Sequence, residues 1–323
     1  MKKILEIKDL FVDYEPGEET IHAVNGIDLT LEEGKTLGLV GETGAGKTTT
    51  ALSIMRLLPE RIGVIKQGSI ILDGKDITKI TEAEMRHMRG NIVSIIFQDP
   101  MTSLNPIKTV GEQVAEVLRN HGNKDNKDVS KRVDEMFQMV GLPKERKKEY
   151  PHEFSGGMKQ RIVIAIALAC EPKLLLADEP TTALDVTIQA QVLNMMEELK
   201  RKLNTSMIMI THDLGVVAET CDYVAVMYAG KIVEEGSVED IFTEGKHHPY
   251  TEGLFGSLPS MAGSNKRLKP IYGLMPNPAD LPTGCSFHPR CPYCKDICKC
   301  NEPDVVEFGI HKIRCHLFSD FNG

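Results

Sequence analysis

Glycines, a lysine and threonines between Gly41 and Thr49 have the types and order that phosphate binding requires. The segment reads Gly-Glu-Thr-Gly-Ala-Gly-Lys-Thr-Thr, which matches G-x-x-x-x-G-K-[ST] between an apolar run and an amphipathic helical stretch. Glycines let backbone N–H groups surround an anion, and the helix start adds a positive dipole end. We predict a nucleotide-phosphate loop, with a plain glycine-rich turn as the alternative, formed by Gly41, Thr43, Gly44, Ala45, Gly46, Lys47, Thr48 and Thr49.

Two carboxylates end a second apolar run, Leu174-Leu-Leu-Ala-Asp178-Glu179. We expect this strand to lie beside the strand that precedes the phosphate loop, so that Asp178 emerges near the phosphates. Asp178 then helps to hold Mg²⁺, together with the Thr48 hydroxyl. Glu179 is positioned to accept a proton from an attacking water. The alternative is that the two acids cap a helix.

Apolar and helical patterns alternate up to about residue 236, which is typical of a parallel sheet with crossover helices. The first thirty residues predict an antiparallel pair, Ile4–Tyr14 and Ile27–Leu31. Further expected strands are Thr36–Val40, Asn91–Ile96, Lys173–Ala177, Ser206–Ile210 and Tyr223–Tyr228. Expected helices are Gly46–Leu58, Val110–His121, Ser130–Val140, Gly157–Cys170, Thr187–Leu203 and Leu214–Glu219.

Composition limits the classes of function. The chain has 323 residues, 41% of them hydrophobic, and a net charge of −8, which argues against nucleic acid as a partner. The longest apolar run, Ile162–Cys170, is too short to cross a bilayer, and the N-terminus has no signal pattern. We therefore expect a cytoplasmic protein whose membrane role comes through other subunits.

The stretch Phe154-Ser-Gly-Gly-Met-Lys-Gln-Arg161 opens a long helix with free N–H groups. Ser155 as an ordinary N-cap is the alternative. S-G-G-x-x-Q-R ahead of an apolar-Asp-Glu strand resembles the signature motif of ABC-type ATPases. Phe154 and Met158 replace that family's usual Leu and Gln.

Other segments resemble ABC elements in the expected order. Gln98 resembles the Q-loop glutamine, a ligand of Mg²⁺ or water. Ala183-Leu-Asp185 resembles the D-loop, His212 the switch histidine, and Tyr14 the aromatic residue that stacks on adenine. The resemblance covers residues 1 to about 236.

This resemblance implies an α/β fold, a P-loop NTPase of ABC type, with an antiparallel β subdomain and a helical subdomain at about 98–170. A Cys-rich extension, 237–323, follows. Two such domains are implied to work head to tail. Glu179, His212 and Gln98 would act in catalysis, and Mg²⁺ would be held through Thr48, Gln98 and Asp178. The residues implied to serve the opposite subunit's ATP are Ser155, Gly156, Gly157 and Gln160.

Two stretches, Phe97–Gly111 and His248–Pro259, are similar to the ATP-binding subunits of dipeptide, oligopeptide and nickel importers. The similarity implies ATP hydrolysis that drives peptide import at the cytoplasmic face of the membrane. The implied partners are a homologous ATPase subunit, two permease subunits and an external binding protein. Alternatives are import of nickel or another solute, and a soluble ABC ATPase with a redox-sensing or zinc-binding tail.

Six of the eight cysteines lie between Cys285 and Cys315, and in a cytosolic chain such a group favours metal over disulfides. The importer resemblance implies a [4Fe–4S] cluster on Cys285, Cys291, Cys298 and Cys315. Zinc is the alternative, although only Cys291 and Cys294 have the close C-x-x-C spacing that zinc favours. Cys294 and Cys300 receive no role.

Overall fold

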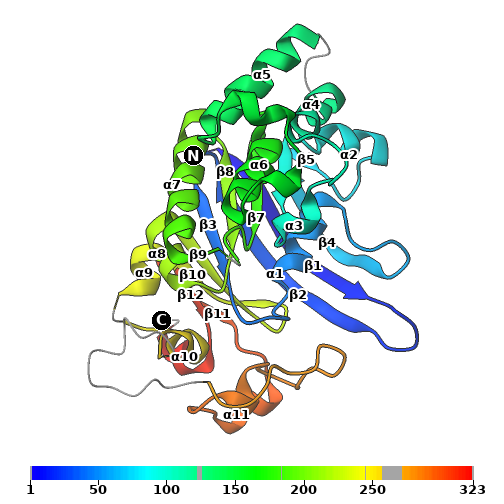
Figure 1. The fold of residues 1–323 in the computed structure, drawn as a ribbon. Coiled ribbons are helices and arrows are strands. Elements are labelled where there is room, and N and C mark those ends of the chain that lie inside the picture. The colour runs from blue at the N-terminus through cyan, green and yellow to red at the C-terminus, as the bar shows by residue number, and fades with distance from the viewer. Residues whose placement is uncertain (1, 122–125, 183, 244, 257–270, 322–323) are drawn as a thin grey trace.

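The computed structural model describes residues 2–121, 126–182, 184–243, 245–256 and 271–321. Ala183 and the end of the stretch His248–Pro259 lie outside them. A central sheet runs through the molecule, with a helical region at one end and the C-terminal extension at the other (Figure 1). This architecture confirms the α/β fold with an antiparallel β part and a helical part.

The central sheet has the order β11-β12-β10-β9-β3-β8-β7-β6. Five of its strands are parallel neighbours, from β9 to β6. The strands are β3 (Thr36–Val40), β6 (Val93–Ile96), β7 (Leu174–Asp178), β8 (Ser206–Ile210), β9 (Tyr223–Tyr228), β10 (Lys231–Ser237), β11 (Val305–Phe308) and β12 (His311–Arg314). The five strands expected in this sheet all form, near their predicted bounds.

One prediction about this sheet was wrong. The strand that ends in Asp178 does not lie beside the phosphate-loop strand, because β8 pairs with both β3 and β7. A parallel sheet aligns the carboxyl ends of all its strands, so β7 still delivers Asp178 to the same edge as the loop after β3. Order within the sheet depends on long-range packing, which a local pattern does not encode.

A second, antiparallel sheet has the order β2-β1-β4-β5. Its strands are β1 (Lys3–Tyr14), β2 (Ile21–Glu32), β4 (Gly63–Leu72) and β5 (Lys75–Asp76). The expected antiparallel pairing of the first two strands is confirmed. The sequence did not indicate β4, which pairs along β1, because exposed and buried residues alternate imperfectly in this strand.

Helices cover both faces of the central sheet, and others lie in the C-terminal extension (Figure 1). They are α1 (Lys47–Met55), α2 (Glu82–Met88), α3 (Pro100–Ser103), α4 (Val110–His121), α5 (Asn126–Met139), α6 (Gly156–Leu168), α7 (Val186–Leu203), α8 (Leu214–Thr220), α9 (Val238–Phe242), α10 (Pro249–Gly256) and α11 (Asp296–Cys300). Short 3-10 helices span Lys144–Lys148, Pro151–Glu153, His288–Arg290 and His316–Phe321.

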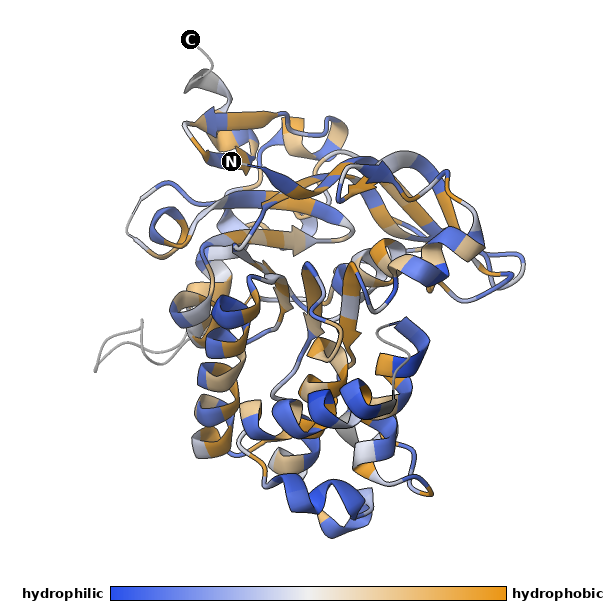
Figure 2. Cartoon of the chain, turned by 90° about the horizontal axis from the view of Figure 1, so that it is seen from above, coloured by the Kyte–Doolittle hydropathy of each residue, from blue (hydrophilic) through white to orange (hydrophobic). Residues whose placement is uncertain are grey.

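Successive side chains of a buried strand point to opposite faces of the sheet, so the two faces have separate hydrophobic clusters. In β7, Leu174 and Leu176 join the cluster with α1 and the antiparallel sheet, whereas Leu175 and Ala177 join the cluster with α4 to α7. Figure 2 shows hydrophobic residues on the strands and hydrophilic ones on the outer surface of the helical region. The α1 helix is thereby fixed between two sheets.

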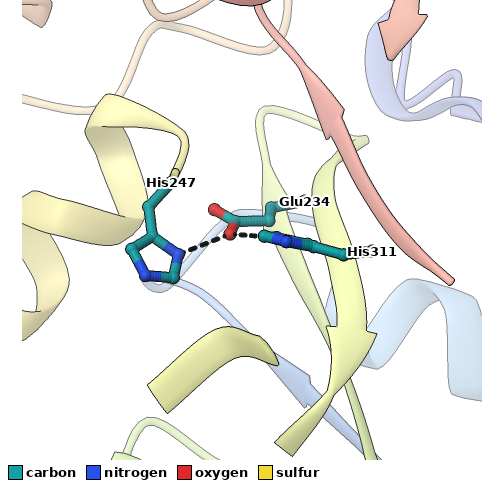
Figure 3. Close-up of side chains that lie close together, drawn as sticks. All are labelled: Glu234, His247 and His311. Carbon is teal, nitrogen blue, oxygen red and sulfur yellow. Dashed lines mark hydrogen bonds and ion pairs between the residues drawn. The ribbon is translucent and has the colours of Figure 1, made fainter. Parts of the chain in front are cut away.

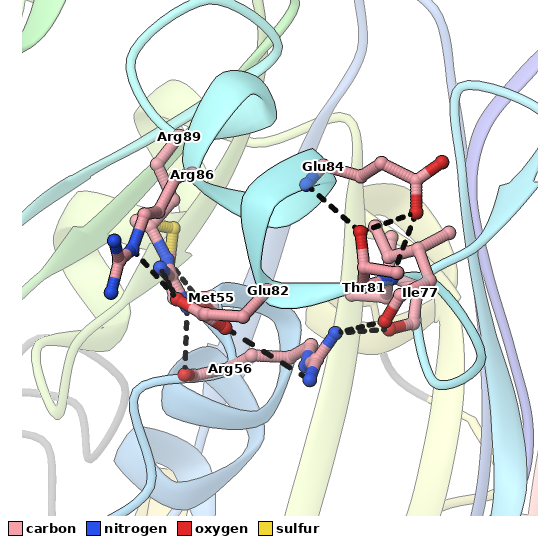
Figure 4. A network of polar contacts seen from close by, with 9 residues as sticks. Met55, Arg56, Ile77, Thr81, Glu82, Glu84, Arg86 and Arg89 are labelled. Atoms are coloured by element: carbon pink, nitrogen blue, oxygen red, sulfur yellow. Dashed lines mark hydrogen bonds and ion pairs between the residues drawn. The ribbon is translucent and has the colours of Figure 1, made fainter.

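Arginines fix the far end of α1 (Figure 4). Arg89 donates to the carbonyl oxygens of Met55 at 2.9 Å and Arg56 at 2.9 Å, which have no partner further along the helix. Arg56 donates to the Ile80 carbonyl oxygen at 2.7 Å. Thr81 and Glu84 form a capping box that starts α2. These bonds hold the helix that follows the phosphate loop.

The C-terminal extension is part of the main fold. Its hairpin, β11 and β12, adds two strands to the central sheet through the pairing of β12 with β10. Beside it, Tyr228 of β9 packs against Tyr250 and Phe287 of the extension, with ring centroids 4.7 Å and 5.1 Å apart. All three side chains are fully buried.

A buried carboxylate joins three segments at this boundary (Figure 3). The Glu234 Oε1 atom of β10 lies 2.8 Å from His247 Nδ1 and 2.8 Å from His311 Nε2, and the His248 N–H donates to Oε2. The other His247 nitrogen faces the Thr243 carbonyl oxygen at 2.8 Å. Both ring nitrogens of His247 face acceptor oxygens, an arrangement that favours the protonated ring and raises the pKa of His247. We call Glu234, His247 and His311 the buried clamp.

Candidate nucleotide site

The phosphate loop curls after β3 in a shape that only glycine permits at two points. Gly41 has φ 151°, and a Cβ there would lie 2.2 Å from the Met227 carbonyl oxygen. Gly46 has φ 104°, and its Cβ would lie 2.4 Å from the Ala23 carbonyl oxygen. Within the loop the Ala45 N–H donates to the Glu42 carbonyl oxygen at 3.1 Å. The glycine-rich motif thus forms a compact loop that packs against β2 and β9.

Groups suited to phosphate and Mg²⁺ converge at the start of α1. Lys47 is buried, and its ammonium donates to the carbonyl oxygens of Gly41 and Glu42 at 2.7 Å and 2.9 Å. The Thr48 hydroxyl, at the exposed start of the helix, donates to Asp178 Oδ2 at 2.8 Å. Thr43 and Gly44 are exposed at the tip of the loop. Thr48 and Asp178, two of the three predicted Mg²⁺ ligands, are therefore in direct contact.

Burial sets the protonation of these charges. It lowers the pKa of Lys47 and raises the pKa of Asp178, in each case against opposing contacts. For Asp178, the hydrogen bond from Thr48 and the Lys47 charge act against burial, whereas Glu179 adds to it. A bound phosphate would add a counter-charge to Lys47, and a bound cation would add one to Asp178.

The Glu179 carboxylate is held by three side chains. Gln98 Nε2 donates to Oε2 at 2.8 Å, the Thr182 hydroxyl donates to Oε2 at 2.9 Å, and His212 Nδ1 lies 3.1 Å from Oε1. Burial acts to raise the pKa of Glu179, but the bonds from His212 and Thr182 outweigh it and the net pKa is lowered. The side chain is therefore an ionised acceptor at neutral pH.

The backbone at Glu179 is left-handed, with φ 48°, and its N–H donates to the Ile210 carbonyl oxygen of β8 at 2.8 Å. A non-glycine residue in this region is strained and is often found at active sites. All three residues predicted for catalysis therefore meet at the ends of β6, β7 and β8. The structure brings Gln98 to Glu179, whereas its predicted bond to Mg²⁺ stays a prediction.

Tyr14 ends β1 beside the helix that follows the loop. Its hydroxyl donates to Thr49 Oγ1 at 3.2 Å. The ring is half-buried next to Gly63, where a Cβ would lie 3.3 Å from the Tyr14 ring. The predicted adenine-stacking residue thus lies next to the phosphate loop.

Ser155 and Gly156 are exposed at the start of α6. Ser155 occupies the N-cap position of α6, as the alternative interpretation expected, but its side chain makes no capping bond. Gly157 faces α7, where a Cβ would lie 2.5 Å from Ile188 Cγ2. Gln160 is fully buried, and its amide atoms have no hydrogen-bond partner within the described residues, so its implied contact with the opposite subunit's ATP stays a prediction. The Ser155 hydroxyl and the first N–H groups of α6 thus lie together at the surface.

Asp185, predicted as the D-loop residue, is the N-cap of α7. Its carboxylate accepts a hydrogen bond from the Ile188 N–H at 3.0 Å. This contact is sufficient to explain an aspartate here. A role towards a second subunit stays a prediction.

All eight cysteines lie in the described part of the chain, and all are free thiols. The other three predicted ligands, Cys285, Cys298 and Cys315, lie close enough to Cys291 for their charges to join burial in raising the pKa of its thiol. Burial raises the pKa of Cys291 to about 12 and that of Cys315 to about 11. Cys300 is exposed.

Comparisons with known proteins agree with this geometry. Residues 24–182 match the family model described as ABC transporter, and residues 233–298 match the one described as oligopeptide/dipeptide transporter, C-terminal region. The oligopeptide transport ATP-binding protein AppD of Bacillus subtilis is 51% identical over 99% of this chain and 98% of its own length. The chain belongs to the ABC transporter family, in the branch of oligopeptide and dipeptide ATP-binding proteins.

Other members of the family are similarly close. The dipeptide transport ATP-binding protein DppD of Bacillus subtilis is 48% identical over 98% of this chain and 95% of its own length. Among solved structures, a dimeric post-hydrolysis state of the ATP-binding cassette MJ0796 with ADP and Pi has a TM-score of 0.65 and 26% identity. The match covers 72% of the present chain and 98% of the MJ0796 chain.

The ABC family member described here is therefore an ATPase that uses ATP with Mg²⁺. No helix in the described ranges is both long enough and apolar enough to cross a membrane.

Sequence analysis missed two residues that border the site. Glu42 stands at a variable position of the loop motif, and Arg290, in the extension, binds its carboxylate. The motif could not indicate this pair, because G-x-x-x-x-G-K-[ST] assigns no type to the second position. The only signal was that Arg290 directly precedes Cys291, one of the predicted cluster ligands.

Proposed function

We propose that this ABC ATPase energises peptide import as one of two homologous ATPase subunits bound to two permease subunits at the cytoplasmic face of the membrane. An external binding protein delivers the cargo. The two units of the chain, 1–236 and 237–323, serve as the ATPase domain and an extension that completes its sheet. The family membership over the whole chain supports this assignment, because relatives named for oligopeptide and dipeptide transport match both units.

The observation that carries the ATPase mechanism is the environment of Glu179. Its ionised carboxylate is fixed by Gln98, Thr182 and His212 at the sheet edge that holds Lys47, Thr48 and Asp178. Lys47 binds the outer phosphates, Thr48 and Asp178 hold Mg²⁺, and Glu179 accepts the proton of the attacking water. Positioning and charge stabilisation account for most of the rate increase.

The second ATPase subunit completes the site. Ser155 leaves its hydroxyl unused by its own helix, and the exposed start of α6 offers N–H groups to an anion. We therefore assign Ser155, Gly156 and Gly157 to the γ-phosphate bound by the opposite subunit. The dimeric state named for the similar MJ0796 cassette supports this arrangement.

The cargo can be tested in vesicles. The complex with its permease and binding protein should hydrolyse ATP faster when the binding protein carries a peptide, and it should accumulate that peptide. Nickel is the matched control cargo. Stimulation and uptake with nickel but not with peptides would contradict the peptide assignment.

The four cysteines suit a [4Fe–4S] cluster better than zinc. A single tetrahedral zinc ion holds its sulfurs about 3.8 Å apart. Within the part of the chain that the structure describes, no three cysteine sulfurs lie within 4.8 Å of one another. Cys291 and Cys315 each lie close enough to Cys285 and Cys298 for the charges of those thiols to join burial in raising their pKa. When bound, the cluster would cross-link the extension, held by Cys285, Cys291, Cys298 and Cys315.

Cluster binding has a direct test. Protein purified without oxygen should contain iron and sulfide, and Cys291→Ser should lose both while it still binds ATP. Cys300→Ser, at an exposed thiol outside the group of four, is the matched control and should keep the iron. Stoichiometric zinc in colourless protein would contradict the proposal.

A further inference from the structure

The C-terminal extension reaches the phosphate loop itself. Arg290 donates from both terminal nitrogens to the two carboxylate oxygens of Glu42, with Nη1–Oε2 at 2.7 Å and Nη2–Oε1 at 3.1 Å. The Arg290 side chain is 5% exposed. Its Nε donates to the Tyr272 carbonyl oxygen at 3.1 Å, which fixes the plane of the guanidinium. Two parallel hydrogen bonds from one guanidinium to one carboxylate fix the relative orientation of the two groups.

A second contact holds the same residue of the loop. The Glu42 N–H donates to the Tyr250 hydroxyl at 2.8 Å, and Tyr250 is fully buried at the start of the extension. The Glu42 carbonyl oxygen accepts a hydrogen bond from Lys47 at 2.9 Å. Glu42 therefore connects two residues of the extension with the lysine that binds phosphate.

Glu42 lies where a small shift would change the phosphate loop. The loop turns immediately after it, where Ala45 bonds back to the Glu42 carbonyl oxygen. A shift of Glu42 would move both this turn and the acceptor of Lys47. Errors in position of about 1 Å are costly in sites that work by orientation.

We infer that Arg290 and Tyr250 are positioning residues for ATP binding, through which the C-terminal extension sets the shape of the phosphate loop. The extension then does more than add strands to the central sheet, because the nucleotide site of this chain is incomplete without it. Arg290 acts on the loop through its paired hydrogen bonds to Glu42.

The test measures the affinity of the full chain for a non-hydrolysable ATP analogue with Mg²⁺, by titration calorimetry. Arg290→Gln and Glu42→Gln should each weaken binding by roughly two- to thirty-fold, the range of couplings through packed contacts. The double variant should be no weaker than either single one, because both changes remove the same pair. The affinity of Arg290→Lys should lie between those of the wild type and Arg290→Gln, since a lysine keeps the charge but cannot make both hydrogen bonds.

Two measurements separate positioning from folding. Arg314→Gln, which breaks an ion pair with Glu302 inside the extension, is the matched control and should leave the affinity unchanged. In the assembled transporter, Arg290→Gln should raise KM for ATP more than it lowers kcat. Affinity within two-fold of the wild type for both Arg290→Gln and Glu42→Gln would overturn the inference. Additive losses in the double variant would overturn it as well.

Discussion

Replacing Glu234 with glutamine removes the charge at the centre of the buried clamp. Glu234 is 1% exposed, and burial alone would raise its pKa, but bonds from His247 and His311 lower it from 4.5 to about 2. A pKa of Glu234 that is about 2.5 lower in the folded chain than in the unfolded chain corresponds to about 3 kcal/mol of stability. Loss of one partner of a buried ion pair costs a similar amount, about 3–5 kcal/mol. We expect Glu234→Gln to lower the free energy of unfolding by about 3 kcal/mol at pH 6.

The pH dependence gives a second check. The stabilisation from Glu234 is present above pH 4.5 and is lost as pH falls towards about 2. The bond to Glu234, opposed by burial, raises the pKa of His247, so its stabilisation is present below 6.5 and is lost as pH rises through the raised value. The wild type should thus lose stability on both sides of this window, and Glu234→Gln should flatten both slopes.

Urea unfolding of the full chain across this pH range measures the effect, with proteolysis of the extension as a local readout. Glu235→Gln is the matched control, because this neighbour on β10 pairs with the part-exposed Lys312 and should cost less than about 1 kcal/mol. A loss below 1 kcal/mol in Glu234→Gln, with unchanged pH slopes, would refute the ion-pair account.

Two further predictions concern assembly. The isolated chain should be mostly monomeric and a poor ATPase, because each site needs a signature motif from a second subunit, and fast hydrolysis by a monomer in light scattering would oppose this. Ser155→Ala should leave ATP binding by the isolated chain unchanged while lowering hydrolysis in the assembled complex, and calorimetry with steady-state rates measures both. Weaker binding in the isolated variant would mean that Ser155 serves its own nucleotide.

The sequence was most informative where a backbone shape demands particular residues. Gly41 and Gly46 could be predicted because their conformations exclude a Cβ, and the buried strands because their apolar runs are unbroken. The order of strands and the pairing of β12 with β10 could not be predicted, since they depend on contacts between residues far apart in the chain.

Side-chain partners divide in the same way. The meeting of Gln98, Glu179 and His212 followed from a resemblance that fixes their order along parallel strands. The bond between Arg290 and Glu42 joins residues 248 positions apart, and no local pattern marks either of them. Long-range polar pairs of this kind emerge only from the structure.

Glu179→Gln tests the central claim most directly. The amide cannot accept the proton of the attacking water, so hydrolysis in the assembled complex should fall by about a hundred-fold or more. With ATP and Mg²⁺, light scattering should detect two chains that retain unhydrolysed ATP between them. Hydrolysis at the wild-type rate, or ATP retained by a monomer, would contradict the account.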